Sequence, residues 1–395
     1  MLEARHPIFN LQFGLICLSS MLFSASYNLL IPELPAYLSQ LGGAEYKGLI
    51  ISLFTLTAGL SRPIIGQLID SIGRKPVLLI GTLVCLICGF LYPVLGTVSG
   101  FLWLRLFHGF STGFNPTAMM AYVSDVVPKN RWGEALGWQG TFFGMGMALG
   151  PALGSFIKLY YSFDVLFYSS SLVAFLSFAL IMNLKETLTN RKPITFRLQK
   201  IPGVNILSNI LSWEVISPAV VTFLTYLTFG MILTLIPDWS EHLGIAYKGL
   251  FFIVFTIASL LIRLVSGKMS DSYGRIPLIF FGLVILLISL LIMGYFQTVS
   301  GLLAASVAYG VAMGILSPAL NAWTVDLSSP ESKGKSIATM FIGLEAGIGI
   351  GALFSGSYYQ NIISKIPNIM FFCAVTILIA IVYLKLYGKE KEEVV

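Results

Sequence analysis

Charged residues are scarce in this sequence of 395 residues. They make up 11% of the chain, whereas a soluble domain carries about a quarter, and apolar residues make up 56%. So few charges cannot cover the surface of an ordinary water-soluble domain. The scarcity therefore excludes a soluble globular fold and indicates that most of the chain lies in lipid.

Histidine and cysteine are rare too, and neither is arranged like a metal site. The three His residues are scattered along the chain (His6, His108, His242). The four Cys residues fall inside apolar runs, where they act as small apolar side chains (Cys17, Cys85, Cys88, Cys373). The nucleotide-binding pattern G-x-x-x-x-G-K-[ST] is missing as well. We expect no metal, no cofactor and no direct use of ATP.

Long apolar runs take the place of the missing charges. About 20 apolar residues suffice to cross the ~30 Å hydrocarbon core as a helix. Because backbone groups in lipid must bond within the chain, and the runs lack the alternation of barrel strands, we expect an all-α polytopic membrane protein. The sequence has twelve such runs, over residues 11–38, 47–69, 77–95, 98–126, 132–157, 164–184, 215–240, 248–270, 277–296, 300–326, 335–358 and 367–387.

The distribution of basic residues predicts the orientation. With both termini in the cytoplasm, 17 of the 24 Lys and Arg residues lie in cytoplasmic segments and only 4 on the opposite side. Such a bias fixes topology by the positive-inside rule. It also explains the net charge of +6 without a nucleic-acid partner.

The chain repeats itself at an offset of 201 residues. The stretch "GQLIDSIGRKP" at 66–76 returns as "GKMSDSYGRIP" at 267–277, and "TVSG" at 97–100 returns at 298–301. "YKGL" at 46–49 returns at 247–250. We therefore expect an N-terminal six-helix bundle (1–184), a cytoplasmic linker (185–212) and a C-terminal six-helix bundle (213–395).

Parallel repeats of six helices are typical of one transporter architecture. Over essentially its whole length the chain resembles the major facilitator superfamily, in particular its drug and metabolite:proton antiporter branch. The stretch 66–76 resembles the family's loop between helices two and three. "RLFHGFSTG" at 105–113 resembles its Arg-centred motif in helix four, and "GMALGPALG" at 146–154 resembles the helix-five motif of its exporters.

The repeated loop predicts a gate at the cytoplasmic side. Asp70 lies at the C-terminal end of its helix, where a negative charge is unfavourable and needs a partner. The resemblance supplies the N-terminus of helix eleven as that partner, with a charge network beside it, and the repeat implies the same contact with helix five. An alternative is that the basic residues only determine topology. The expected gate residues are Gly66, Asp70, Gly73, Arg74 and Asp125, with Gly267, Asp271, Gly274, Arg275 and Asp326 in the second half.

Helix five carries a face without side chains. Gly146, Gly150, Pro151 and Gly154 leave that face smooth and weaken its hydrogen-bond ladder. We expect a hinge that slides against a helix of the other half; the alternative is a simple close-packing face. In the family that the chain resembles, this pattern is commoner among exporters that exchange substrate for protons.

Two charges fall deep inside the predicted membrane spans. A charge at mid-membrane costs about 2.5–3.5 kcal/mol, so each one is a candidate for function. Arg105 matches the family's intramembrane Arg, which the resemblance associates with proton coupling. Glu345 lies near the centre of helix eleven. Its equivalent position in the first half is Gly144, so the charge breaks the symmetry of the two halves. Burial favours a neutral carboxyl, as a proton carrier requires; the alternative is a structural hydrogen bond.

Further polar residues complete the candidate cavity for protons and substrate. Glu33 and Asp238 each lie near the outer end of a helix, close after a Pro, and interfacial placement is the alternative for both. Tyr27, Asn28 and Asn115 are expected to line the cavity. His108 is a weaker candidate, because a lone His is more often a packed, satisfied side chain.

The sequence thus predicts a secondary active transporter rather than an enzyme. We expect a monomer in a bacterial inner membrane that exchanges protons for a small, amphipathic molecule by alternating access. An importer or facilitator of a sugar or other metabolite is the alternative within the same fold. A membrane receptor or enzyme is less favoured, since the chain has neither a sizeable soluble segment nor a cluster of catalytic groups.

Overall fold

The computed structural model describes residues 10–128, 131–188, 211–329 and 333–388. Within its helices, side chains at a few positions lie outside the described part (63, 66, 67, 133, 264, 267, 268, 271, 333 and 334). The side chains of three predicted gate residues are therefore not described (Gly66, Gly267, Asp271). Most of the predicted linker falls in 189–210 and is not described either.

The described chain contains twelve helices of 18 residues or more, and the all-α polytopic fold is confirmed. Eight of them are long and apolar enough to cross a membrane by length and composition. The first half contains α1 (Leu11–Asn28), α3 (Lys47–Ile72), α4 (Arg74–Leu91), α5 (Val98–Val126), α6 (Trp132–Tyr160) and α7 (Phe163–Met182). The second half contains α9 (Ile216–His242), α10 (Leu250–Tyr273), α11 (Arg275–Tyr295), α12 (Val299–Leu327), α13 (Lys333–Tyr359) and α14 (Ile366–Tyr387).

One predicted helix is wrong in its extent. The expected run over 11–38 is broken after α1, and a short helix α2 (Leu34–Gln40) follows a turn over 29–33. Pro32 and Pro35 explain the break, because proline lacks the N–H group that a continuous helix needs. Pro35 instead stands in the first turn of α2, where that N–H is not required. Single 3-10 turns precede α3, α9 and α14 (η1 Ala44–Tyr46, η3 Trp213–Val215, η4 Ile363–Lys365).

The repeated motifs form the same local structures in both halves. The Thr97 side chain accepts a hydrogen bond from the backbone N–H of Gly100 at 3.1 Å and so caps α5. Thr298 caps α12 through Gly301 at the same distance. Gly73 and Gly274 precede α4 and α11 with φ of 115° and 87°, a backbone region that favours glycine. The spacing that recurs in both halves therefore encodes helix starts.

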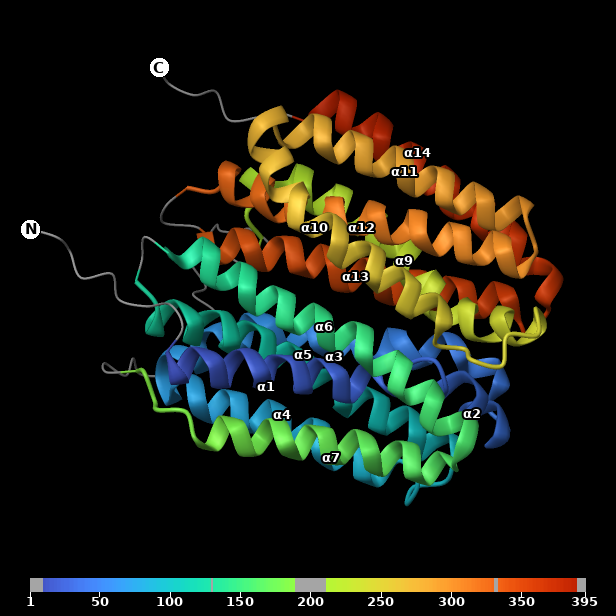
Figure 1. Cartoon of the computed structure of the whole chain (residues 1–395), viewed down its shortest axis with the longest axis horizontal. Coiled ribbons are helices and arrows are strands. Elements are labelled where there is room, and N and C mark those ends of the chain that lie inside the picture. The colour runs from blue at the N-terminus through green and yellow to red at the C-terminus, as the bar shows by residue number, and fades with distance from the viewer. Residues whose placement is uncertain (1–9, 129–130, 189–210, 330–332, 389–395) are drawn as a thin grey trace, which may run out of the picture. The chain divides into compact units, whose positions relative to one another are not determined.

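The helices form two compact units. The first comprises residues up to 31 and residues 60–196. Its core lies where α1 packs on α6 and α7, and where α4 packs on α5 and α7. The second unit comprises residues 32–59 and 197–395, so it contains α2 and the first part of α3. In this unit α9 packs on α13, α12 contacts α10 and α11, and α14 lies beside α11 (Figure 1).

Candidate functional site

An inner charge cluster joins α3, α4 and α5 in the first unit. The Arg74 guanidinium donates through Nε to Asp125 at 2.9 Å and contacts Asp70 through Nη1 at 3.3 Å. Glu186, which follows α7, accepts hydrogen bonds from the backbone N–H groups of Arg74 at 3.1 Å and Lys75 at 3.0 Å. An acid at the start of a helix is favourable, so Glu186 caps α4 and fixes the position of Arg74.

The second unit contains the repeat counterpart. Arg275 donates through Nε to Asp326 at 2.9 Å, the same atoms and distance as in the first unit. Its Nη1 donates to Ser270 at 2.7 Å. The contacts of Asp70 with helix eleven and of Asp271 with helix five stay predictions. Glu186 was not anticipated from the sequence, because it lies 112 residues after Arg74 in the chain.

Arg105 lies in a buried polar chain within the first unit. Its side chain is 2% exposed, and Nη1 donates to the Tyr92 hydroxyl at 3.4 Å. The Tyr92 hydroxyl is 3.2 Å from Nδ1 of His108, whose Nε2 is 3.2 Å from the Cys85 sulfur. Cys85 contacts the Ser26 hydroxyl at 3.2 Å. The chain therefore links α5, α4 and α1, and the fully buried His108 fits the packed, satisfied interpretation.

The other predicted cavity residues of the first unit are held by their own bundle. Asn115 is fully buried and donates to the Thr82 hydroxyl at 2.7 Å. Asn28 donates to the Ser24 carbonyl at 2.8 Å, one turn earlier on α1. Tyr27 is half-buried, with its ring 5.5 Å from that of Phe23. Of these, Tyr27 is the one with accessible side-chain surface, and the cavity role of all three stays a prediction.

The glycine face of α6 packs on α1 of the same unit. A Cβ added to Gly150 would lie 2.8 Å from the Ala25 carbonyl oxygen, and one added to Gly154 would overlap the Leu29 carbonyl. The glycines of this face thus contact α1, and the sliding of the face against a helix of the other half stays a prediction. The close-packing interpretation fits the structure, while the hinge role of Pro151 stays a prediction.

Four helices bring a polar cluster together around Glu345 in the second unit. Glu345 of α13 is 8% exposed, and a Cβ on Gly59 of α3 would lie 3.3 Å from the Glu345 Cβ. The Tyr226 hydroxyl of α9 lies within electrostatic range of Ser317 of α12, of Arg263 of α10 and of Glu345. An acid, a cation and two hydroxyl groups therefore share one region.

The four residues of this Glu345 cluster differ in how exposed their side chains are. Glu345 is buried, Tyr226 and Ser317 are half-buried, and Arg263 is exposed. A carboxyl group can take up and release a proton, whereas a guanidinium keeps its charge. The arrangement therefore places an ionisable carboxyl and a fixed cation each within electrostatic range of Tyr226. Sequence reasoning identified Glu345 but missed Tyr226 and Ser317, since hydroxyl residues are common in helices.

A second charged group lies at the helix ends expected to face outward. Lys47 at the start of α3 forms an ion pair with Asp238 of α9, and each side chain is 10% exposed. The Tyr359 hydroxyl at the end of α13 donates to the same Asp238 oxygen at 3.1 Å. We call Lys47, Asp238 and Tyr359 the outer cluster. Asp238 is thus a paired residue at a helix end, whereas Lys47 and Tyr359 were not anticipated from the sequence.

The backbone supports the outer cluster. Gly48 and Gly356 lie so close that a Cβ on Gly356 would overlap the Gly48 backbone. Just beyond the ends of these two helices, the Asn361 side chain donates to the Ala44 carbonyl at 3.1 Å. Glu33, at the N-cap position of α2, is 4% exposed in the same unit. The start of α3 and the end of α13 are therefore fastened together at the outer cluster.

We expect loss of Lys47 to loosen this fastening. In Lys47→Gln, Asp238 stays buried without its cation, and breaking a buried ion pair costs roughly 3–5 kcal/mol. Ser52→Cys on α3 should then react faster with a water-soluble maleimide. The native background is low because all four Cys residues are buried. Labelling rates of Ser52→Cys with and without Lys47→Gln measure the effect.

The exposed ion pair between Lys248 and Glu241 provides the control, at 2.6 Å and with Glu241 65% exposed. Lys248→Gln should leave the labelling rate unchanged, since exposed pairs contribute only about 0–1 kcal/mol. The exchanged pair Lys47→Asp with Asp238→Lys should restore slow labelling. Equal acceleration by Lys248→Gln would contradict the assignment.

Comparisons with known proteins agree with this architecture. The family model described as Major Facilitator Superfamily matches residues 16–216 and 219–394. The multi-drug resistance efflux pump PmrA homolog of Lactococcus lactis is 26% identical over 383 residues, 93% of each chain. The multidrug resistance protein MdtG of Salmonella arizonae is 29% identical over 359 residues, 86% of this chain and 88% of that protein.

Solved structures show the same fold at low identity. The human organic anion transporter MFSD10 (TETRAN) has a TM-score of 0.73 and 20% identity, covering 95% of this chain and 99% of that one. A D-xylose–proton symporter has a TM-score of 0.79 and 16% identity, covering 96% and 99%. At such identity the likeness shows the fold alone.

Proposed function

Since this chain belongs to the major facilitator superfamily of membrane transporters, we propose that it is a proton-coupled exporter of a small, amphipathic molecule. In this proposal Glu345 carries the proton. Export exchanges a proton that enters from outside for a substrate that leaves the cytoplasm.

The Glu345 cluster is the observation that supports this proposal most. A buried acid within electrostatic reach of Tyr226, with Arg263 nearby, has two charge states of different cost in a low-dielectric surrounding. In the neutral form Glu345 holds the proton and the substrate site is empty. In the ionised form Glu345 has released the proton. Competition between proton and substrate at one carboxyl couples the two fluxes.

Alternating access would use the charge clusters at both ends. We propose that the repeat halves 1–184 and 213–395 are the two moving bodies. The Arg74 and Arg275 ion pairs would lie at the inner rim of the transporter, and the outer cluster would lie at its outer rim. The outer cluster is engaged in this structure. Opening outward would then require the Lys47 ion pair to separate.

The names of the relatives support the direction of transport. Two relatives of nearly full length are called multidrug efflux or multidrug resistance proteins. We propose the same class of cargo, a monomeric state and a bacterial cytoplasmic membrane with both termini inside. The sugar symporter among the solved structures shares only the fold, so it does not favour import.

Transport in inverted membrane vesicles tests the proposal. A thermal-shift screen of drugs and metabolites selects the probe, because a ligand that binds the native state raises its apparent stability. Vesicles with an acidic lumen should accumulate that probe, or ethidium as a standard amphipathic dye, and lose it when an ionophore collapses the pH gradient. Accumulation only in right-side-out vesicles with acid outside would establish import instead.

A further inference from the structure

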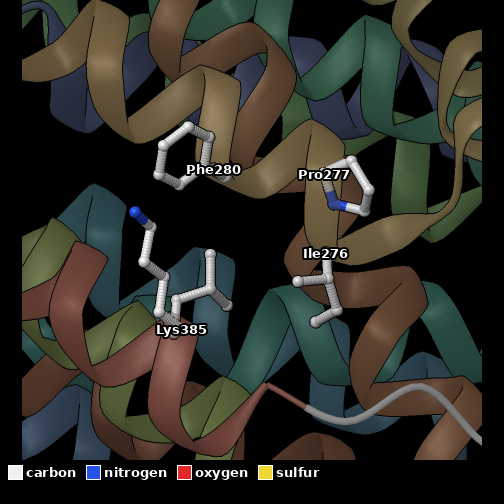
Figure 2. Close-up of a pocket in the computed structure, with 5 residues that line it drawn as sticks. Ile276, Pro277, Phe280 and Lys385 are labelled. Atoms are coloured by element: carbon white, nitrogen blue, oxygen red, sulfur yellow. The ribbon is translucent and has the colours of Figure 1, made fainter.

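A pocket between α11 and α14 shares no lining residue with the Glu345 cluster or the outer cluster, and it begins at the residue after Arg275. It has a volume of about 420 Å³ and is lined by Ile276, Pro277 and Phe280 of α11 and by Leu384 and Lys385 of α14. Figure 2 shows the Lys385 side chain extending toward the Phe280 ring, with Ile276 and Pro277 on the opposite wall. The volume is that of a small-ligand pocket, and four of the five residues that line the pocket are apolar.

Among the described residues that line the pocket, Lys385 alone is charged. Its ammonium nitrogen lies 5.2 Å from the centre of the Phe280 ring, and no carboxylate partner occurs among the residues that the structure describes. The lining residues include no acid. Among the described residues, the pocket can therefore neutralise one negative group, but it has no carboxylate for the cation of a zwitterionic headgroup.

The surroundings place the pocket at the level of lipid headgroups. It lies where α11 begins and α14 ends, at the side expected to face the cytoplasm. Tyr273 just before α11 is 70% exposed, and Tyr387 at the end of α14 is 56% exposed. Tyrosine is enriched at membrane interfaces, and the cytoplasmic leaflet carries anionic lipids.

We propose that this pocket binds an anionic phospholipid. The phosphate pairs with Lys385, while the glycerol and first methylene groups lie against Phe280, Leu384 and Ile276. The charge selects the headgroup and the apolar walls select a lipid over a free anion. This inference does not depend on the direction of transport or on the role of Glu345.

Native mass spectrometry of the full chain in detergent tests the proposal. Phosphatidylglycerol should bind the wild type more tightly than phosphatidylcholine does. Removing a single Lys from an anionic lipid surface costs about 1 kcal/mol, so Lys385→Gln should lose about fivefold in phosphatidylglycerol affinity. Phosphatidylcholine carries the same phosphate, but its choline cation offsets that charge, so its affinity should fall less. Phe280→Ala should weaken both lipids, because it removes an apolar wall.

Lys158 provides a matched control, because its ammonium lies 4.5 Å from the Phe163 ring in the first unit. Lys158→Gln removes the same charge from the same kind of contact and should leave lipid affinity unchanged. Equal loss in both Lys variants, or equal affinity for the two lipids, would overturn the site. Displacement of the lipid by millimolar inorganic phosphate would assign the pocket to a free anion. Unchanged melting temperatures of both variants show that the comparison concerns binding.

Discussion

Glu345→Gln should abolish transport that is driven by a pH gradient while leaving the protein folded. Glutamine has nearly the shape of glutamic acid and keeps a polar side chain in the Glu345 cluster, but it cannot release a proton. Probe accumulation in acid-lumen inverted vesicles should therefore fall to the level measured without a gradient. Because the neutral state of the carboxyl is mimicked, the melting temperature in detergent should stay equal or rise.

Two further variants separate coupling from simple damage. Glu241→Gln makes the same chemical change at a side chain that is 65% exposed, and it should transport normally. Tyr226→Phe removes the hydroxyl that lies within electrostatic range of Glu345, and it should reduce transport without abolishing it. Gradient-driven transport by Glu345→Gln at the wild-type rate would remove Glu345 from the mechanism and leave the fold assignment untouched.

Local signals in the sequence predicted most of the fold. The twelve long helices follow from the length and composition of the apolar runs. Thr97 and Thr298 cap their helices because a Thr–x–x–Gly stretch needs no distant partner. The break after α1 was missed although both prolines were visible. The apolar run continues through them, and hydropathy alone does not register the missing N–H groups.

The candidate sites were predicted less completely, because their partners lie far apart in the chain. Lys47 and Asp238 are separated by 191 residues, and each by itself resembles an ordinary interfacial charge. Nothing in either segment specifies the other. The ion pair between Arg74 and Asp125 could be anticipated only because the resemblance associates the two motifs. Glu345 was found because a charge in an apolar run is visible without its partners.

The sequence also did not show which helix packs on the α6 glycine face. A row of small residues predicts close packing of a helix, but it does not say which helix approaches. In the structure α1 packs on α6, and in the second unit α9 packs on α13. Gly347 and Gly351 of α13 approach the backbone of Phe223 and Leu227 as Gly150 and Gly154 approach α1. Both units therefore use the same backbone contact to hold their helices together.

Gly154→Ala should destabilise the protein strongly, since the new methyl group would overlap the Leu29 carbonyl in a space with no flexible side chain to move. Overpacking of this kind costs typically 1–3 kcal/mol, and Gly154→Leu should cost more and prevent recovery of folded protein. Thermal unfolding in detergent and the yield of monodisperse protein measure both effects. Gly150→Ala should behave in the same way, because its Cβ would lie 2.8 Å from the Ala25 carbonyl oxygen.

The same helix provides its own control with the opposite sign. Gly137 and Gly140 of α6 have nothing within 4 Å of an added Cβ. Alanine is favoured over glycine inside a helix by up to about 1 kcal/mol, so Gly140→Ala should leave the melting temperature unchanged or raise it. Equal melting temperatures of Gly140→Ala and Gly154→Ala would mean that α1 does not hold α6 through this face. The face would then be free to slide, as the sequence alone suggested.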